Sequence, residues 1–183
     1  MQKYLITSRE FYGDTSGEFC LNLCKQIEKH QPDFVLYRDK NTQNYDEIAA
    51  VFVAECKKFE NVKSFLHQDS VLAKKLGASG VHLTSSQFDM VAEAKKMGLF
   101  VIISTHTNEE VLRAQMLGAD AVTYSPIFAS PNKGEPKGLE DLRELLDICN
   151  IKVFALGGIV TGEHVAMIEQ TKAHGFASIR YFY

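Results

Sequence analysis

Three histidines in the middle of the chain, His67, His82 and His106, are candidates for acid/base or metal chemistry. Imidazole is the side chain that titrates closest to neutral pH, so one of the three acting as a general acid or base is a working hypothesis. A three-histidine metal site is the alternative, but the spacing fits no compact ligand motif. His82 also falls within an apolar run, where it can hydrogen-bond inside the core. We therefore predict no metal site from these residues.

Two loops carry groups suited to phosphate binding. Gly157 and Gly158 expose backbone N–H groups just ahead of a helix predicted to begin near Thr161, and helix N-termini hold anions. A purely structural turn is the alternative interpretation of this glycine pair. A second loop supplies a hydroxyl, an amide and an ammonium group from Ser130, Asn132 and Lys133. These groups fit a second phosphate clamp, although a solvated polar loop would have the same composition.

The elements that must position these residues follow one repeated pattern: an amphipathic helix, then Gly, then a short apolar run. Gly77, Gly98 and Gly118 end three such helices at intervals of about 20 residues, which is one compact βα unit each. The apolar runs are typical of parallel strands that helices cover. Predicted strands span residues 3–7, 33–37, 62–66, 80–83, 100–104, 120–124, 152–156 and 176–182. Predicted helices span residues 16–29, 45–58, 69–76, 86–97, 108–117, 138–148 and 162–172.

Strict alternation of eight strands with seven helices predicts an α/β fold, a closed (β/α)₈ TIM barrel with short loops and the last helix missing. A doubly wound open sheet is the alternative, but it has fewer strands and usually a Gly-rich first turn, which this chain lacks. Active sites of such barrels lie at the carboxyl ends of the strands. The polar residues that follow each apolar run are therefore expected to meet at one rim.

Composition excludes several classes of partner. The 183 residues fit one domain spanning 1–183, and 45% of them are hydrophobic, enough for a sizeable core. The net charge is −3 with no concentration of basic residues, so nucleic acid is not an expected partner. The four cysteines have neither zinc-site nor redox spacing. Because no apolar run matches a signal peptide or a bilayer span, we expect a cytoplasmic protein without a membrane partner.

A series of landmarks in register suggests a family. They are Leu5-Ile6-Thr7, Arg38-Asp39-Lys40, residues 76–83, Ser104-Thr105-His106, residues 117–122, Pro126-Ile127-Phe128, residues 137–140 and residues 155–159. In this order they resemble the landmarks of the thiamin phosphate synthase and TenI superfamily across essentially the whole chain. The resemblance implies a small, often dimeric (β/α)₈ barrel that acts in vitamin B1 synthesis on a pyrimidine pyrophosphate and a thiazole phosphate.

The departures from the synthase pattern concern its magnesium ligands. The Gln-x-Arg-x-Lys motif after the second strand keeps Arg38 and Lys40. The two magnesium-binding Asp positions of the synthase fall at Gln68 and Gln87, and Asp69 and Asp89 could replace them only if each loop were shifted. The resemblance therefore implies no certain cofactor, and Mg²⁺ only if synthase activity is retained.

The departures from the TenI pattern concern its histidine. TenI proteins that are enzymes shift a proton to make the thiazole aromatic, and they lack the two magnesium-binding Asp residues. Their histidine after the sixth strand aligns with Pro126 in this chain. The resemblance matches Gly157 and Gly158 to the thiazole-phosphate site, and Ser130 and Lys133 to the synthase's Thr-x-Thr-Lys loop. Arg180 either binds an anion in the barrel or neutralises a nearby carboxylate.

We predict a TenI-like, tautomerase-type protein that binds a thiazole phosphate or thiamin phosphate. The predicted acid/base residue is His106 or His67. The predicted ligand-binding residues are Arg38, Lys40, Ser104, Ser130, Asn132, Lys133, Gly157, Gly158 and Arg180. Thiamin phosphate synthase activity is one alternative, and a non-catalytic ligand-binding or regulatory protein is the other. We also predict a homodimer, in which a partner subunit covers a groove next to Tyr181, Phe182 and Tyr183.

Overall fold

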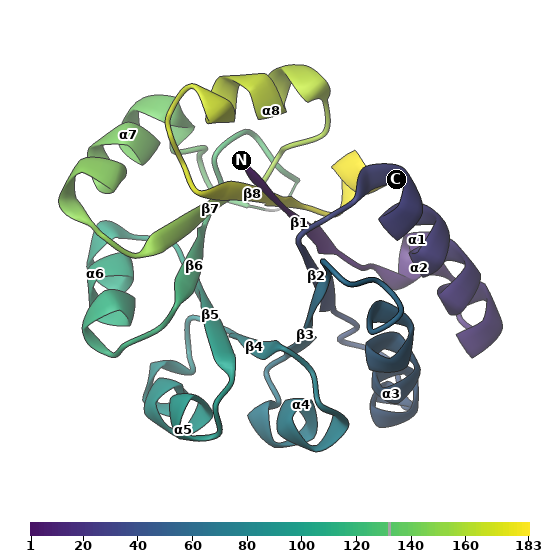
Figure 1. Ribbon diagram of the computed structural model, residues 1–183. Coiled ribbons are helices and arrows are strands. Elements are labelled where there is room, and N and C mark those ends of the chain that lie inside the picture. The colour runs from purple at the N-terminus through teal and green to yellow at the C-terminus, as the bar shows by residue number, and fades with distance from the viewer. Residues whose placement is uncertain (132) are drawn as a thin grey trace.

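Eight parallel strands pair in chain order and close into a barrel, because β1 pairs with both β2 and β8 (Figure 1). The computed structural model describes residues 1–131 and 133–183. The strands are β1 (Gln2–Ile6), β2 (Phe34–Tyr37), β3 (Lys63–His67), β4 (Gly80–Leu83), β5 (Phe100–Thr105), β6 (Ala121–Tyr124), β7 (Lys152–Leu156) and β8 (Gly175–Ser178). The closed barrel is confirmed, and the open doubly wound sheet is wrong.

Helices surround the barrel on the outside (Figure 1). They are α1 (Arg9–Tyr12), α2 (Ser16–His30), α3 (Tyr45–Cys56), α4 (Ser70–Leu76), α5 (Val91–Lys96), α6 (Asn108–Met116), α7 (Gly138–Ile148) and α8 (Gly162–Glu169). Two 3₁₀ turns, η1 (Phe88–Met90) and η2 (Arg180–Phe182), complete the fold. The predicted helix 86–97 is therefore a 3₁₀ turn followed by α5, and the short α1 was not predicted. After β8 the described residues form η2 rather than an α-helix.

Successive side chains along each strand point alternately out of the barrel and into it, so the core has an outer part and an inner part. Leu5 and Val35 point outward to the helices, whereas Tyr4 and Phe34 point inward. The interior is filled by large side chains that are almost completely buried, and Phe65 and Phe154 pack against the Tyr4 ring with centroids at 5.8 and 5.6 Å. This aromatic plug fills the interior and leaves the carboxyl ends of the strands for the site.

The eighth strand is shorter than predicted. It ends at Ser178, whose Oγ accepts a hydrogen bond from Tyr181 N (3.2 Å) and so turns the chain into η2. Phe182 then folds back onto Phe176, with nearly parallel rings 5.6 Å apart, and is completely buried. Tyr183 packs on Phe11, with centroids at 4.6 Å. Phe182 and Tyr183 thus pack against residues of the same chain, and the groove and the homodimer stay predictions.

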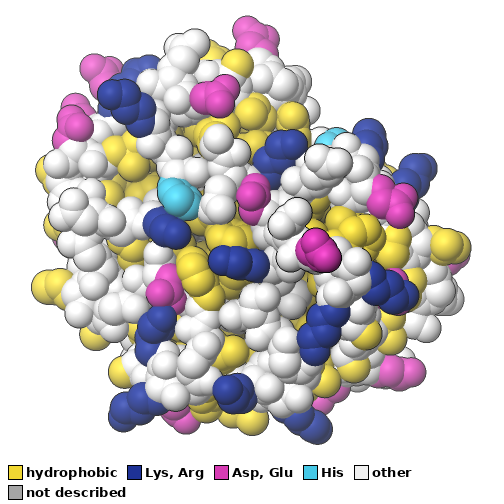
Figure 2. All heavy atoms as spheres, in the orientation of Figure 1, with side chains coloured by type: hydrophobic (Ala, Val, Ile, Leu, Met, Phe, Trp, Pro, Cys, Tyr) yellow, Lys and Arg dark blue, Asp and Glu magenta, His cyan; other side chains and the backbone are white. Residues whose placement is uncertain are grey.

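Two findings bear on the expected partners. On the face that Figure 2 shows, Lys and Arg side chains are interspersed with Asp and Glu and form no continuous basic patch. In the part of the chain that the structure describes, no helix combines the length and apolar character needed to cross a bilayer.

Candidate functional site

A cavity of about 350 Å³ lies at the carboxyl ends of the strands, above the aromatic plug. Ten of the predicted site residues line it: Arg38, Lys40, His67, Ser104, His106, Ser130, Lys133, Gly157, Gly158 and Arg180. Asn132, the remaining one, lies outside the described residues. The barrel thus brings together residues from six of its strand ends, and their individual roles stay predictions.

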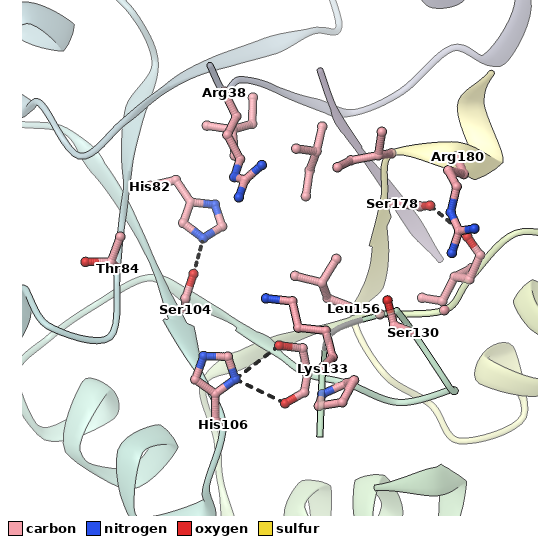
Figure 3. Close-up of a pocket in the computed structure, with 18 of the residues that line it drawn as sticks. Arg38, His82, Thr84, Ser104, His106, Ser130, Lys133, Leu156, Ser178 and Arg180 are labelled. Atoms are coloured by element: carbon pink, nitrogen blue, oxygen red, sulfur yellow. Dashed lines mark hydrogen bonds between the residues drawn. The ribbon is translucent and has the colours of Figure 1, made fainter. Parts of the chain in front are cut away.

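Four cationic side chains face this cavity, and no acidic side chain is among the described residues that line it. Arg38 follows β2, where its backbone N donates to Thr7 Oγ1 at 3.0 Å. Repulsion from Arg38, then partial burial and the charge of Lys133, lower the pKa of Lys40. Lys133 reaches toward the middle of the cavity and Arg180 lies on the other side from Arg38 (Figure 3). This arrangement favours a ligand with anionic groups.

The glycine pair after β7 lets two loops pack closely. Gly158 has φ +70°, and a Cβ there would come within 2.5 Å of the Ala129 carbonyl oxygen. Phe128 N donates to Gly157 O at 3.0 Å, so the loop after β6 is fixed to the loop after β7. The N-terminus of α8 follows directly, capped by Thr161. Backbone N–H groups and a helix dipole at one rim are suited to bind phosphate.

His106 is positioned at the rim by Ser125, which follows β6, and by Glu110 of α6. Its Nδ1 lies 3.2 Å from both the Ser125 carbonyl oxygen and Ser125 Oγ, and its backbone N donates to Glu110 Oε2 at 2.6 Å. A carbonyl oxygen can only accept, so Nδ1 carries the proton in this arrangement. Nε2 then has a free lone pair and can act as a base.

His67 is less suited to proton transfer. Burial, followed by the charges of Arg38 and Lys40, lowers the pKa of His67 to about 4. An imidazole with so low a pKa remains neutral at pH 7 and is a weak base. Of the two predicted acid/base residues, His106 is the better suited.

His82 was one of the three acid/base candidates and was also expected to hydrogen-bond inside the core, and these hydrogen bonds are present. Its Nδ1 lies 2.8 Å from Tyr4 Oη. Its Nε2 lies 2.9 Å from Ser104 Oγ (Figure 3). It also lines the cavity, which the sequence analysis missed. The signal was present in the alternation of β4, because Val81 and Leu83 face the helices and His82 must then face the interior.

Comparison with known proteins agrees with this geometry. The sequence profile of the family described as thiamine monophosphate synthase matches residues 3–182. The chain belongs to the thiamine monophosphate synthase family. Its member from Fusobacterium nucleatum, a thiamine-phosphate synthase, is 34% identical over 185 residues, covering 96% of this chain and 86% of the relative. The thiamine-phosphate synthase of Syntrophomonas wolfei is 28% identical over 183 residues, covering 96% of this chain and 85% of the relative.

A solved structure supports the same assignment. The thiamine phosphate pyrophosphorylase from Pyrococcus furiosus matches with a TM-score of 0.82 and 25% identity, covering 97% of this chain and 85% of the other. The predicted resemblance to the thiamin phosphate synthase and TenI superfamily is confirmed. Membership of the thiamine monophosphate synthase family places the protein in thiamine biosynthesis.

The positions that would hold Mg²⁺ in a synthase do not fit the ion in this family member. Gln87 Oε1 accepts from Thr84 N at 3.1 Å, and Gln87 Nε2 donates to the Gln68 carbonyl at 3.3 Å. Asp69 Oδ1 caps α4 by accepting from Leu72 N at 2.8 Å. Asp89 is exposed on η1 and does not line the cavity. Mg²⁺ prefers carboxylate oxygens, and here neutral amides replace them. The Gln87 amide binds protein groups, and Gln68 takes part through its backbone carbonyl.

The two alternatives for Arg180 are distinguished by its surroundings. Within residues 1–131 and 133–183, Arg180 forms no salt bridge, although it lines the cavity with Ser130 and Ser178. Figure 3 shows its guanidinium beside these two residues. This position supports the anion-binding alternative, and the role of Arg180 stays a prediction.

Acid is expected to destabilise this family member through His82. Burial, followed by the charges of His67 and Arg38, lowers the pKa of His82 to about 3, whereas histidine in an unfolded chain has a pKa of about 6.5. Between these values the unfolded state binds more protons, so the free energy of unfolding is highest above pH 6.5 and falls as the pH falls toward 3. The expected loss from pH 7 to pH 5 is about 2 kcal/mol for this group.

Urea unfolding at the two pH values measures this loss. His82→Gln should show a smaller difference between them, because Gln does not titrate. The pKa of His67 is also lowered, and His67 is still present in the variant. The variant should therefore keep part of the loss in the free energy of unfolding at low pH. An identical pH dependence in wild type and variant would contradict the prediction.

Proposed function

We propose that this protein binds a thiazole phosphate or thiamin phosphate in the cavity and catalyses a TenI-type proton shift that makes the thiazole aromatic. The observation that carries the proposal is the combination of a cation-lined cavity with neutral amides, Gln68 and Gln87, at the metal-ligand positions, where the Gln87 amide is hydrogen-bonded to protein groups. A proton shift moves one proton from one ring atom to another and has no leaving group to stabilise. It therefore needs one acid/base group and a phosphate anchor.

In this proposal the two sides of the cavity have different tasks. Gly157, Gly158 and Arg180 bind the phosphate at the rim near α8, together with Ser130. His106 Nε2 removes the proton from the ring and returns it at the second position. Arg38 and Lys40, on the side away from Arg180, and Lys133, toward the middle of the cavity, attract the anion.

Thiamin phosphate synthase activity is the second candidate. The relatives named above are synthases or a pyrophosphorylase, and Arg38, Lys40 and Lys133 form a group of three cations. Such a group can stabilise a pyrophosphate leaving group by charge alone. The bond formed would join the pyrimidine methylene to the thiazole nitrogen, and the bond broken would release pyrophosphate.

Two assays distinguish the candidates. One follows aromatisation of the thiazole phosphate tautomer by its absorbance, and the other follows thiamin phosphate formation from the pyrimidine pyrophosphate and thiazole phosphate, with and without Mg²⁺. Aromatisation without thiamin phosphate formation supports the proposal. Thiamin phosphate formation contradicts it in favour of the synthase. If both assays are negative while thiamin phosphate binds, the protein is a non-catalytic ligand-binding member of the family.

Replacing Arg180 tests the phosphate anchor. Arg180→Gln is expected to weaken thiamin phosphate binding about tenfold, because a charge-assisted hydrogen bond is lost. Binding of thiamin, which lacks the phosphate, should stay within about twofold of wild type by calorimetric titration. Arg143→Gln, at an exposed position on α7, is the matched control and should change neither affinity. Unchanged binding of thiamin phosphate by Arg180→Gln would exclude the anchor role.

A further inference from the structure

A chain of three side chains connects the barrel interior to the cavity. Tyr4 from β1, His82 from β4 and Ser104 from β5 are linked by contacts of 2.8 Å (Tyr4 Oη to His82 Nδ1) and 2.9 Å (His82 Nε2 to Ser104 Oγ). Tyr4 is completely buried, His82 is 3% exposed, and Ser104 lines the cavity. The chain therefore runs from a completely buried side chain to the ligand site.

The surroundings of Tyr4 determine the direction of the first hydrogen bond. The ring lies among Phe34, Phe65 and Phe154, with centroids between 5.6 and 5.8 Å away. Among the described residues, His82 Nδ1 is the one hydrogen-bond partner of the Tyr4 hydroxyl. If Nδ1 carried a proton and donated it to Tyr4, the phenolic hydrogen would be buried without an acceptor, which is costly. Tyr4 is therefore the donor and Nδ1 the acceptor.

The direction of the second bond follows from the first. A neutral imidazole whose Nδ1 accepts must carry its proton on Nε2, and this N–H donates to Ser104 Oγ. Burial raises the pKa of Tyr4 and lowers that of His82 to about 3, so both groups keep these protonation states near neutral pH. Because Ser104 Oγ accepts from His82, its own hydrogen is free to point into the cavity.

We propose that Tyr4 and His82 are positioning residues that fix Ser104 as a hydrogen-bond donor to the ligand. The site would then select a ligand that places an unprotonated acceptor atom opposite Ser104 Oγ. Without the two buried residues, the Ser104 hydroxyl could instead donate to a neighbouring protein group and present a lone pair to the ligand. The ligand part of this inference rests on the proposed function, whereas the tautomer of His82 does not.

The tautomer is tested in the free protein. Nitrogen-15 NMR of histidine-labelled protein distinguishes a protonated ring nitrogen from an unprotonated one, and His82→Gln assigns the signals. The expected result is a protonated Nε2 and a hydrogen-bonded, unprotonated Nδ1 at neutral pH. A protonated Nδ1 would overturn the proposal, whatever ligand the protein binds.

The effect on the ligand is tested by a double-mutant cycle with thiamin phosphate as the probe. Ser104→Ala is expected to weaken binding about tenfold, and Tyr4→Phe about threefold to fivefold. In the Ser104→Ala background, Tyr4→Phe should have no further effect, because its influence passes through Ser104. Additive effects would overturn the proposal, since Tyr4 would then act on binding by another route.

Three variants separate positioning from packing. Tyr12→Phe removes another buried tyrosine hydroxyl, one with no hydrogen-bond partner among the described residues, and should leave binding unchanged. His82→Gln keeps an N–H donor toward Ser104, so this variant should bind thiamin phosphate more tightly than His82→Leu. Equal losses of affinity in the two variants would contradict the proposed role. If thiamin phosphate fails to bind wild-type protein, the proposed function fails, and the NMR result still decides the His82 tautomer.

Discussion

Replacing His106 by Gln is expected to slow the thiazole proton shift by a factor of about 10² to 10⁴. Gln has a similar size and keeps a donor near the Ser125 carbonyl, but it cannot take up a proton. Thiamin phosphate binding should stay within about twofold of wild type, because the phosphate is bound by other groups. Steady-state rates of aromatisation, together with calorimetric binding, measure the two effects separately.

Two other histidines are the controls for this change. His174→Gln alters a histidine outside the cavity, whose Nε2 lies 2.7 Å from Gln2 Oε1, and should leave the rate unchanged. His67→Gln should reduce the rate less than tenfold, because a base with a pKa of about 4 contributes little at neutral pH. A larger loss with His67→Gln than with His106→Gln would reverse the assignment of the base.

The positions of the predicted site residues were accessible from the sequence because parallel barrels have a simple geometry. Once eight apolar runs are recognised, the residues that follow each run must meet at one rim. Arg38 and Lys133 are far apart in sequence, and both line the cavity for this reason. Gly158 could be identified as part of a turn with exposed backbone N–H groups, although its close approach to the Ala129 carbonyl could not.

The features that were missed depend on contacts between distant segments. The apolar run after Ser178 has the composition of a strand, but Phe182 is needed to cover Phe176, and this contact turns the chain. The short α1 is stabilised by Tyr12, which packs on Tyr183 from a distant part of the chain as well as on the nearby Phe19. The direction of the His82 hydrogen bonds depends on Tyr4, 78 residues earlier. Local pattern alone contains none of this information.

Gly158→Ala is expected to destabilise the protein by about 3 kcal/mol and to weaken thiamin phosphate binding at least tenfold. Its φ of +70° is unfavourable for a residue with a Cβ, and the added atom would meet the Ala129 carbonyl oxygen at 2.5 Å and the Phe128 carbonyl carbon at 2.7 Å. The backbone must then move away from the loop after β6. Since this loop carries Ser130 and Lys133, the same movement separates the two sides of the anion site.

Gly98→Ala is the matched control, because Gly98 has φ +78° and nothing lies within 4 Å of an added Cβ. This substitution should lower the free energy of unfolding by about 1 kcal/mol through backbone strain alone, and it should leave ligand binding unchanged. Urea unfolding and calorimetric titration of both variants separate strain from close approach. Similar destabilisation of the two variants would mean that the loop after β6 yields easily to the added methyl group. Wild-type affinity in Gly158→Ala would mean that the phosphate does not depend on the contact between these two loops.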